Sequence, residues 1–390
     1  MKTSAVLQRM GLTSSALSVF FLPALLVKTP TASATTYSFT ALPGVGAQSA
    51  AFGVNSTGTA VVGWADDAAG AQQAFSYSGG TMTDLGALGG TASYATAVND
   101  SGIVVGGADK VGGGHEHAYS DSNGTLTDLG TLGGSDSAAW GINDSGKIVG
   151  WADNAAGVKY AFETSPGLSM GEIPLYGRLG IQSSAAYAVN GTGTAAGKVE
   201  ESGGTSYHAA IFQSTGYMDL GTLGGNASMA WGVNNSETVV GQADDSSGTY
   251  HAFSYTAAGG MKDLGTLGGS ASYAYAINAS GVIVGLAENK AGKKHAFVYA
   301  DGTMTDLNAA AVGLPTDFTL EYANGISSAG VIVGTGLDGS GSYEAYILTP
   351  VSEPNTAVLL AAAGVGLALL KRCNNATLHA KNSSPLGGPG

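Results

Sequence analysis

Four histidines stand at equivalent places in a repeating sequence, and they are the first candidates for chemistry. They are His117, His208, His251 and His295, and an alanine follows each of them. An imidazole at such a place could bind a metal ion or transfer protons. Gln73, Tyr160 and Glu344 occupy the same place in other repeats, so we interpret these histidines as structural. His115 and His117 form a His-x-His pair, a zinc-like spacing that has no third ligand nearby.

Carboxylates recur with the same regularity, in two groups. The first group opens a recurrent Asp-Leu phrase and comprises Asp84, Asp128, Asp219, Asp263 and Asp306. Aspartate at such a place commonly accepts hydrogen bonds from turn amides, and we favour that role over cation binding. The second group lies in polar, Gly-containing loops and comprises Asp66, Asp67, Asp109, Asp153, Glu200, Glu201, Asp244, Asp245, Glu288 and Asp338.

The acidic residues of the loops are candidates for calcium binding. Their oxygens suit Ca²⁺, and the candidates are Asp66, Asp67, Asp153, Asp244 and Asp245. No loop has a complete calcium-loop spacing, so we favour solvated hairpin tips. Ca²⁺ is the only cofactor that the sequence suggests, and no residue stands out as catalytic.

The elements that position these residues are repeats. Asp-Leu-Gly-Ala-Leu-Gly-Gly starts at residue 84, and Asp-Leu-Gly-Thr-Leu-Gly-Gly starts at residues 128, 219 and 263. The starts at 84 and 128 are 44 residues apart, as are those at 219 and 263, and such a period indicates an array of similar units. Each unit predicts four short strands, such as 138–143, 148–151, a third strand centred on Ala161, and a fourth like 125–129. The segment between the first two strands, Asn143-Asp-Ser-Gly146, has the residues typical of a four-residue hairpin turn, with asparagine first and glycine last.

The number of units can be counted from this turn. It recurs at Asn55, Asn99, Asn143, Asn190, Asn234 and Asn278, with Ser327 in a seventh copy. The seventh unit lacks a fourth strand, and the segment 37–42 resembles a fourth strand with no unit before it. Joining the two closes a ring. We therefore predict an all-β fold: a seven-bladed β-propeller of four-stranded antiparallel blades over 35–350, its last blade closed by the N-terminal strand. An open β-solenoid is the alternative.

Composition limits the function. The net charge is −13 and only 11% of residues are charged, so the chain is not expected to bind a nucleic-acid backbone. The 63 glycines indicate many tight turns.

The two ends indicate where the protein works. Residues 1–34 read as a secretory signal peptide, with Lys2 and Arg9 before an apolar stretch at 16–27, and Ala32-Ser-Ala34 as the cleavage site. Near the other end, Ser352-Glu353-Pro354 precedes an apolar run at 357–370 and the basic pair Lys371-Arg372. A plain membrane anchor would need about 20 apolar residues. Residues 373–390, which include the only cysteine, are predicted to be a disordered tail.

These motifs resemble two known families. His-Ala-Phe among units of Asp-Leu-Gly-Thr-Leu-Gly-Gly and Ile-Asn-x-x-Gly-x-Ile-Val-Gly resembles the bacterial HAF-repeat proteins, over roughly 40–348. The segment 351–372 resembles a PEP-CTERM sorting signal, although Ser352 replaces the usual first proline and 18 residues follow the basic pair. This second resemblance implies membrane retention and processing by an exosortase-like enzyme in bacteria that make exopolysaccharide.

Together these observations predict an exported, non-enzymatic repeat protein of the bacterial cell surface or extracellular matrix. It would act as a scaffold that binds exopolysaccharide or a surface protein, with membrane contact through the C-terminal segment. The alternative is a polysaccharide-active enzyme, a glycosidase or lyase, with acids or aromatics concentrated in one or two units. The degenerate segment 174–180 and the insertion at 308–319 are where we expect such asymmetry.

Overall fold

The fold was analysed in a computed structural model. It describes residues 35–351 except 43, 45, 113, 166, 176–179, 202–205 and 214–215. The predicted signal peptide (1–34), the sorting motif with Ser352, Glu353, Pro354, Lys371 and Arg372, and the tail 373–390 lie outside the described residues. Within the described part of the chain, no helix has the length and hydropathy that a bilayer span requires.

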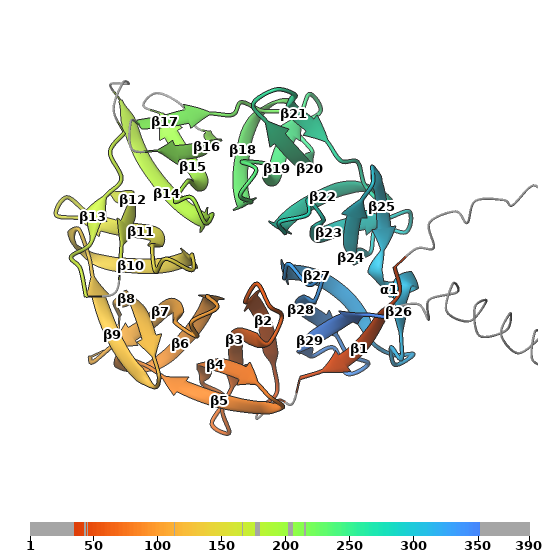
Figure 1. The fold of residues 1–390 in the computed structure, drawn as a ribbon, viewed down its shortest axis with the longest axis horizontal. Helices are drawn as coiled ribbons and strands as arrows, with labels where there is room; N and C mark the ends of the chain where they lie inside the picture. Colours follow the sequence, from red (N-terminus) through yellow and green to blue (C-terminus); the bar gives the residue numbers. More distant parts are fainter. Residues whose placement is uncertain are drawn as a thin grey trace, which may run out of the picture. The chain divides into compact units, whose positions relative to one another are not determined.

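The described residues form seven antiparallel sheets arranged in a ring, which confirms the predicted seven-bladed β-propeller (Figure 1). Blades 1 to 6 each contain four strands that follow one another along the chain. The innermost strand of a blade lies at the ring's centre, and the chain then steps outward (Figure 1).

The first three blades have these strands. Blade 1 contains β2 (Ser49–Val54), β3 (Ala60–Asp66), β4 (Gln72–Ser78) and β5 (Thr81–Gly86). Blade 2 contains β6 (Gly89–Val98), β7 (Val104–Lys110), β8 (Glu116–Ser122) and β9 (Thr125–Gly130). Blade 3 contains β10 (Gly133–Ile142), β11 (Ile148–Asn154), β12 (Lys159–Thr164) and the two-residue β13 (Gly171–Glu172).

The next three blades repeat the order. Blade 4 contains β14 (Ile181–Val189), β15 (Ala195–Glu201), β16 (Tyr207–Gln213) and β17 (Gly216–Asp219). Blade 5 contains β18 (Gly224–Val233), β19 (Val239–Asp245), β20 (Tyr250–Thr256) and β21 (Gly260–Asp263). Blade 6 contains β22 (Gly268–Ile277), β23 (Ile283–Asn289), β24 (Lys294–Ala300) and β25 (Thr303–Asp306).

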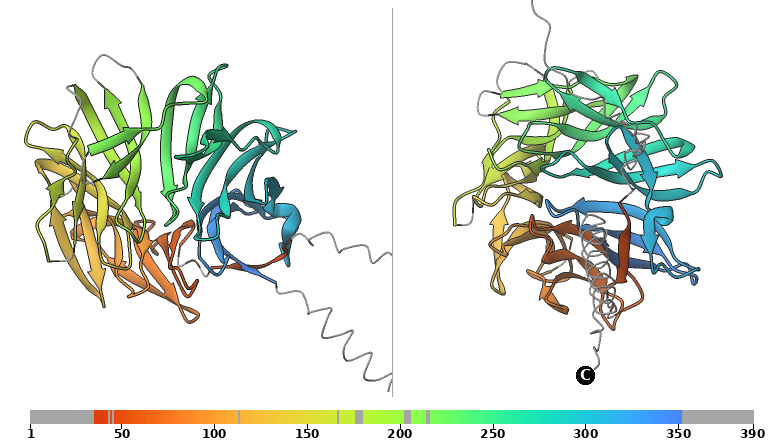
Figure 2. Two further views of the ribbon diagram at one scale, coloured as in Figure 1. Left: turned by 45° about the horizontal axis from the view of Figure 1, so that its top comes forward. Right: turned by 45° about the vertical axis from the view of Figure 1, so that its right-hand side comes forward.

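Blade 7 is built from both ends of the propeller, as predicted. Its strands are β27 (Thr319–Ile326), β28 (Ile332–Leu337), β29 (Tyr343–Pro350) and the N-terminal β1 (Tyr37–Ala41). β1 pairs with β29 in antiparallel register from Tyr37↔Pro350 to Ala41↔Tyr346. The first and last strands of the propeller thus lie side by side (Figures 1 and 2).

The insertion at 308–319 covers this closure. It contributes the helix α1 (Leu307–Ala310) and the short strand β26 (Ala311–Val312), which pairs in parallel with β1 as a fifth strand of blade 7. Phe318 lies 5.0 Å from the ring of Phe39 on β1 and is buried with Leu307. Covering a sheet edge in this way prevents unwanted strand pairing. The insertion therefore covers the outer edge of the closing strand.

Burial between blades explains why the second and third strands are apolar on both sides. The phenylalanine two residues after the histidine position is almost fully buried, as at Phe75, Phe162, Phe253 and Phe297. Phe297 of blade 6 packs with Val240 and Ala252 of blade 5. Burying one such ring stabilises the fold by about 1.5–3 kcal/mol, so each blade depends on its neighbour.

The innermost strands differ from the prediction at their start. We expected one of them at 138–143, but β10 begins at Gly133, inside the Gly-Gly of the recurrent phrase. Gly133 has a φ of +100°, and a Cβ on Gly134 would collide with the carbonyl of Asn154. The Gly-Gly pair is therefore required because the segment that crosses from one blade to the next lies in close contact with the end of the second strand.

Candidate functional site

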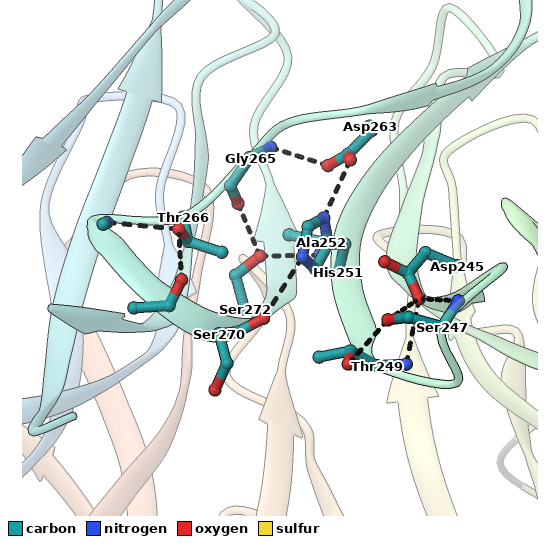
Figure 3. A network of polar contacts seen from close by, with 12 residues as sticks. Asp245, Ser247, Thr249, His251, Ala252, Asp263, Gly265, Thr266, Ser270 and Ser272 are labelled. Atoms are coloured by element: carbon teal, nitrogen blue, oxygen red, sulfur yellow. Dashed lines mark hydrogen bonds and ion pairs between the residues drawn. The ribbon is translucent and has the colours of Figure 1, made fainter. Parts of the chain in front are cut away.

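The repeat histidines bind the aspartate of their own blade. In blade 5, His251 Nδ1 lies 2.8 Å from Asp263 Oδ2, and His251 Nε2 lies 3.1 Å from the carbonyl oxygen of Ser270 (Figure 3). The same pairs form at His117–Asp128, His208–Asp219 and His295–Asp306. Each pair joins the third strand of a blade to its fourth.

The same aspartates accept turn hydrogen bonds, as the sequence predicted. Asp263 Oδ1 accepts the N–H of Gly265 at 2.7 Å, and Asp84, Asp128 and Asp219 do the same for the glycine two residues later. Asp306 accepts the N–H of Asn308. One motif residue thus stabilises its own turn and fixes a neighbouring histidine.

A serine completes the group without forming a nucleophilic triad. Ser272 Oγ accepts the N–H of Ala252 at 2.8 Å and donates to the carbonyl oxygen of Gly265 at 2.6 Å (Figure 3). A catalytic serine would instead donate to the imidazole. Because Ser272 belongs to blade 6 and Ala252 to blade 5, this serine connects neighbouring blades. Ser93, Ser137 and Ser228 make the same two bonds.

The predicted metal candidates are spread over the blades. His115 faces Asp136 at 3.4 Å, whereas His117 faces Asp128. Asp67 and Asp245 accept amide hydrogen bonds from their own hairpin turns. Oδ1 of Asp153 and Oδ1 of Asp244 are buried without a hydrogen-bond partner among the described residues. In that part of the chain no three His, Cys, Asp or Glu side chains lie close enough together to hold a metal ion. Asp66 lies at the end of β3 in the same hairpin as Asp67, and Ca²⁺ at these residues stays a prediction.

A different set of residues lines the centre of the ring. Each innermost strand has a β-bulge at an equivalent residue, which its second strand leaves unpaired. In blade 3, for example, Ala139 pairs with Gly150 and Gly141 pairs with Val149, so Trp140 is skipped. The seven bulge residues are Phe52, Thr96, Trp140, Tyr187, Trp231, Tyr275 and Asn324. These same seven residues line one central cavity of about 260 Å³. We call it the bulge-lined channel.

The bulge explains how these side chains reach the axis and why the second strand needs glycine. A bulge inserts one residue and redirects its side chain. It also brings the innermost backbone close to the second strand: a Cβ on Gly150 would overlap the carbonyl of Ala138, and one on Gly241 would overlap that of Met229. The glycine of each Ile-Val-Gly signature therefore makes room for the bulge.

The bulge-lined channel is aromatic on one side. Trp140 and Tyr187 make an edge contact with ring centroids 5.5 Å apart, and Tyr187 lies 4.6 Å from Trp231. Tyr275 lies 6.3 Å beyond Trp231. Blades 3 to 6 thus present a continuous aromatic wall, and burial raises the pKa of the Tyr187 and Tyr275 hydroxyls, which stay neutral. Trp140 Nε1 is a buried donor without a hydrogen-bond partner among the described residues.

The aromatic wall continues to one face of the ring. Tyr273 stacks beside Tyr275 at 6.4 Å, and Tyr250 lies 6.1 Å from Tyr273. The hydroxyls of Tyr250 and Tyr207 are 3.2 Å apart. Lys198 Nζ lies 4.6 Å from the ring centroid of Tyr207. Residues Trp151, Lys159, Lys198, Tyr207, Tyr250 and Tyr273 will be called the aromatic mouth.

On the opposite face, hydrogen bonds join neighbouring turns. Five turn asparagines donate a side-chain N–H to the backbone carbonyl of the next turn, from Asn99 to Asn143 and onward to Ser327, whereas Asn55 donates to Thr57 and Thr59 of its own turn. These bonds are 2.9–3.2 Å long. This explains why asparagine recurs at the turn, and the same turns line a second cavity of about 260 Å³.

Sequence reasoning missed the bulge-lined channel, although a signal was present. Its residues stand three places before the turn asparagine, or before Ser327 in the seventh unit, as in Trp140-Gly-Ile-Asn143 and Tyr275-Ala-Ile-Asn278. This position varies among aromatic and polar residues, while the residues around it stay small or apolar. Variation at one place in a constant frame is the pattern expected of a binding position.

Comparison with known proteins shows the fold alone. No protein-family model matches the chain, and no curated protein matches it. A puromycin hydrolase has 13% identity and a TM-score of 0.53, over 77% of this chain and 51% of its own length. The BP39L lectin from Burkholderia pseudomallei has 10% identity and a TM-score of 0.41, over 82% of this chain and 99% of its own. AofleA from Arthrobotrys oligospora has 8% identity and a TM-score of 0.40, over 70% of this chain and 89% of its own.

The chain spans about half the length of the puromycin hydrolase structures that it matches. At these identities the likeness supports a propeller and identifies no activity.

Proposed function

We propose that the protein is an exported, non-enzymatic propeller that binds a glycan at the bacterial cell surface or in the extracellular matrix. The observation that carries this proposal is the bulge-lined channel, in which five of the seven blades place an aromatic side chain at one equivalent position. The signal-like N-terminus and the sorting-like C-terminus support export and an exosortase-like processing partner.

The chemistry of the channel suits a sugar. A pyranose ring has apolar C–H faces that pack on aromatic rings, and hydroxyls that need donors and acceptors. Tyrosine and tryptophan offer both an apolar ring and a polar group. Thr96 and Asn324 add polar atoms on the remaining side of the channel. Ligand pockets usually start near about 300 Å³. The 260 Å³ channel therefore suits one sugar unit, with the rest of a chain lying on the aromatic mouth.

A glycan array on the full-length protein tests the proposal. We expect binding by the wild type and a loss of about fivefold or more in Trp231→Ala, since losing one stacking platform removes about 1–3 kcal/mol. Tyr255→Ala is the matched control because it truncates another aromatic of blade 5, away from the channel. Equal binding by both variants, or no binding of any glycan by the wild type, would refute the proposal. Cell fractionation that finds the intact chain in the cytoplasm would refute export.

A polysaccharide-active enzyme is the second candidate, and Glu116 favours it. Burial raises the pKa of the Glu116 carboxyl, which hydrogen-bonds to the Tyr94 hydroxyl beside the aromatic mouth. A glycosidase uses a protonated carboxyl of this kind together with a second carboxylate. Release of reducing ends from the host's exopolysaccharide, abolished in Glu116→Gln, would favour the enzyme over the binding protein.

A further inference from the structure

The bulge-lined channel lies on the axis of a closed ring, and this limits how a ligand reaches it. One residue from each of the seven blades lines the channel, and the innermost strands surround the centre in Figure 1. The pairing of β1 with β29 closes the seventh blade. A polymer segment could enter from the side only if two blades separated. Contacts between blades oppose such separation, as where the Ser272 hydroxyl joins blades 5 and 6. A ligand therefore enters the channel along the axis.

On the side of the turns, the axis is lined by aliphatic side chains. They stand two residues after each bulge residue, about 7 Å further along the strand. Six of them line the second cavity, and we call these six residues the aliphatic collar: Val54, Val98, Ile142, Val189, Ile277 and Ile326. Valine and isoleucine side chains have no hydrogen-bonding atom, so a sugar in the collar would bury hydroxyls without side-chain partners there, which is unfavourable. The collar therefore disfavours passage of a glycan beyond the channel.

On the other side of the channel, aromatic rings continue toward the aromatic mouth. Tyr273 stands two residues before Tyr275 on β22, and their rings are nearly parallel, at an interplanar angle of 12°. Tyr250 follows, with its ring centroid 6.1 Å from that of Tyr273. Each of these rings offers an apolar face and a hydroxyl. A glycan that leaves the channel on this side therefore meets further surfaces on which sugar rings can pack.

We propose that the bulge-lined channel binds the terminal sugar unit of a glycan, so that the protein recognises chain ends and not internal segments. This inference rests on the proposed glycan-binding function and adds which part of the glycan is bound. The 260 Å³ channel suits one sugar unit. An internal unit would bring two flanking chains through the same end of the channel, or would push one of them into the aliphatic collar. A terminal unit has a single flanking chain, which lies on Tyr273 and Tyr250.

Mechanical shearing of a polysaccharide tests the inference, because it creates chain ends and leaves the sugar composition unchanged. The probes are the host's exopolysaccharide and any polymer whose fragments bind on the glycan array, each before and after ultrasonic shearing. Co-sedimentation measures the full-length protein bound at saturation. If shearing shortens the average chain about tenfold, the protein bound per unit mass of polymer should rise about tenfold, since each chain offers an end and not a run of sites.

The outcomes separate this inference from the proposed function. Equal amounts of bound protein per unit mass before and after shearing would mean that internal segments are bound. That result would overturn chain-end recognition and keep the proposed glycan-binding function. Binding to none of the polymers, with the glycan array also negative, would overturn both.

Variants test whether the chain end lies in the channel. Thr96→Trp fills the channel from blade 2, at a position where blades 3 and 5 already carry tryptophan, and should abolish binding to intact and sheared polymer. Thr125→Trp is the matched control, because Thr125 is exposed at the start of β9 in the same blade, and it should bind like the wild type. The melting temperature shows whether each variant is folded. Wild-type binding by folded Thr96→Trp would overturn the placement of the chain end in the channel.

Discussion

Ser272→Ala tests whether the serine links between blades stabilise the ring. Ser272 is fully buried and joins the Ala252 N–H of blade 5 to the Gly265 carbonyl through its hydroxyl (Figure 3). The substitution leaves one buried donor and one buried acceptor without partners. Each such group costs about 1–3 kcal/mol, so we expect the free energy of unfolding to fall by about 2–6 kcal/mol.

Urea denaturation followed by tryptophan fluorescence measures this loss. Ser280→Ala is the matched control in the same blade: its hydroxyl bonds to Asn278 Oδ1 at an exposed turn, whose amide bonds remain without it. The control should change stability by at most about 0.5 kcal/mol. Hydrogen exchange at the Ala252 amide should accelerate only in Ser272→Ala. If Ser272→Ala matched the control in both measurements, the serine would not be an energetic link between blades.

Two further predictions concern the bulge and the repeat aspartates. Gly241→Ala should destabilise the fold by about 1–3 kcal/mol or more in thermal unfolding, because the new Cβ would overlap the Met229 carbonyl. Gly171→Ala is the control and should be close to neutral, because its Cβ would lie 3.9 Å from the nearest neighbouring atom. Equal melting temperatures of the two variants would contradict the crowding argument. Burial raises the pKa of Asp128, but hydrogen bonds from Gly130, His117 and Lys110 outweigh this effect, and the net pKa is lowered. The charged carboxylate therefore stabilises the fold fully above the unfolded-state pKa of about 3.9, and this stabilisation is lost as the pH falls through the lower folded-state pKa. Asp128→Asn should flatten the decline of melting temperature below about pH 4, and an unchanged decline would exclude this role.

The fold could be predicted from the sequence because its construction recurs. Backbone geometry favours the turn asparagine, the strand-two glycine and the crossover Gly-Gly, so the glycine repeats in all seven units, the asparagine in six and the Gly-Gly in four. The split blade was visible because Tyr37–Ala41 had no preceding strands and the unit ending at Pro350 lacked one. These features depend on the local preferences of the residues and on the number of strands in each unit, and both can be read from the sequence.

The candidate site could not be predicted in the same way, because it depends on one-residue register shifts. A bulge changes which side chains face the axis, and the period-two pattern of a strand does not reveal it. Trp140, Tyr187 and Trp231 are separated by more than 40 residues in sequence and meet only when the ring closes. The histidines attracted attention because they recur, and their recurrence reflects the bonds that hold each blade together.

The contrast between recurring and varying positions bears directly on function. A residue that bonds one blade to the next, such as the bonded serine or the turn asparagine, cannot be changed freely to suit a ligand. The bulge residue is different, because its side chain points away from its own sheet and leaves the ladder unbroken whichever side chain it carries. Seven such positions surround one axis, so substitutions at Trp140 or Tyr275 can reshape the channel while the blades stay intact. A propeller built in this way separates stability from specificity, and the residues that differ between its blades are the ones to alter when its ligand is sought.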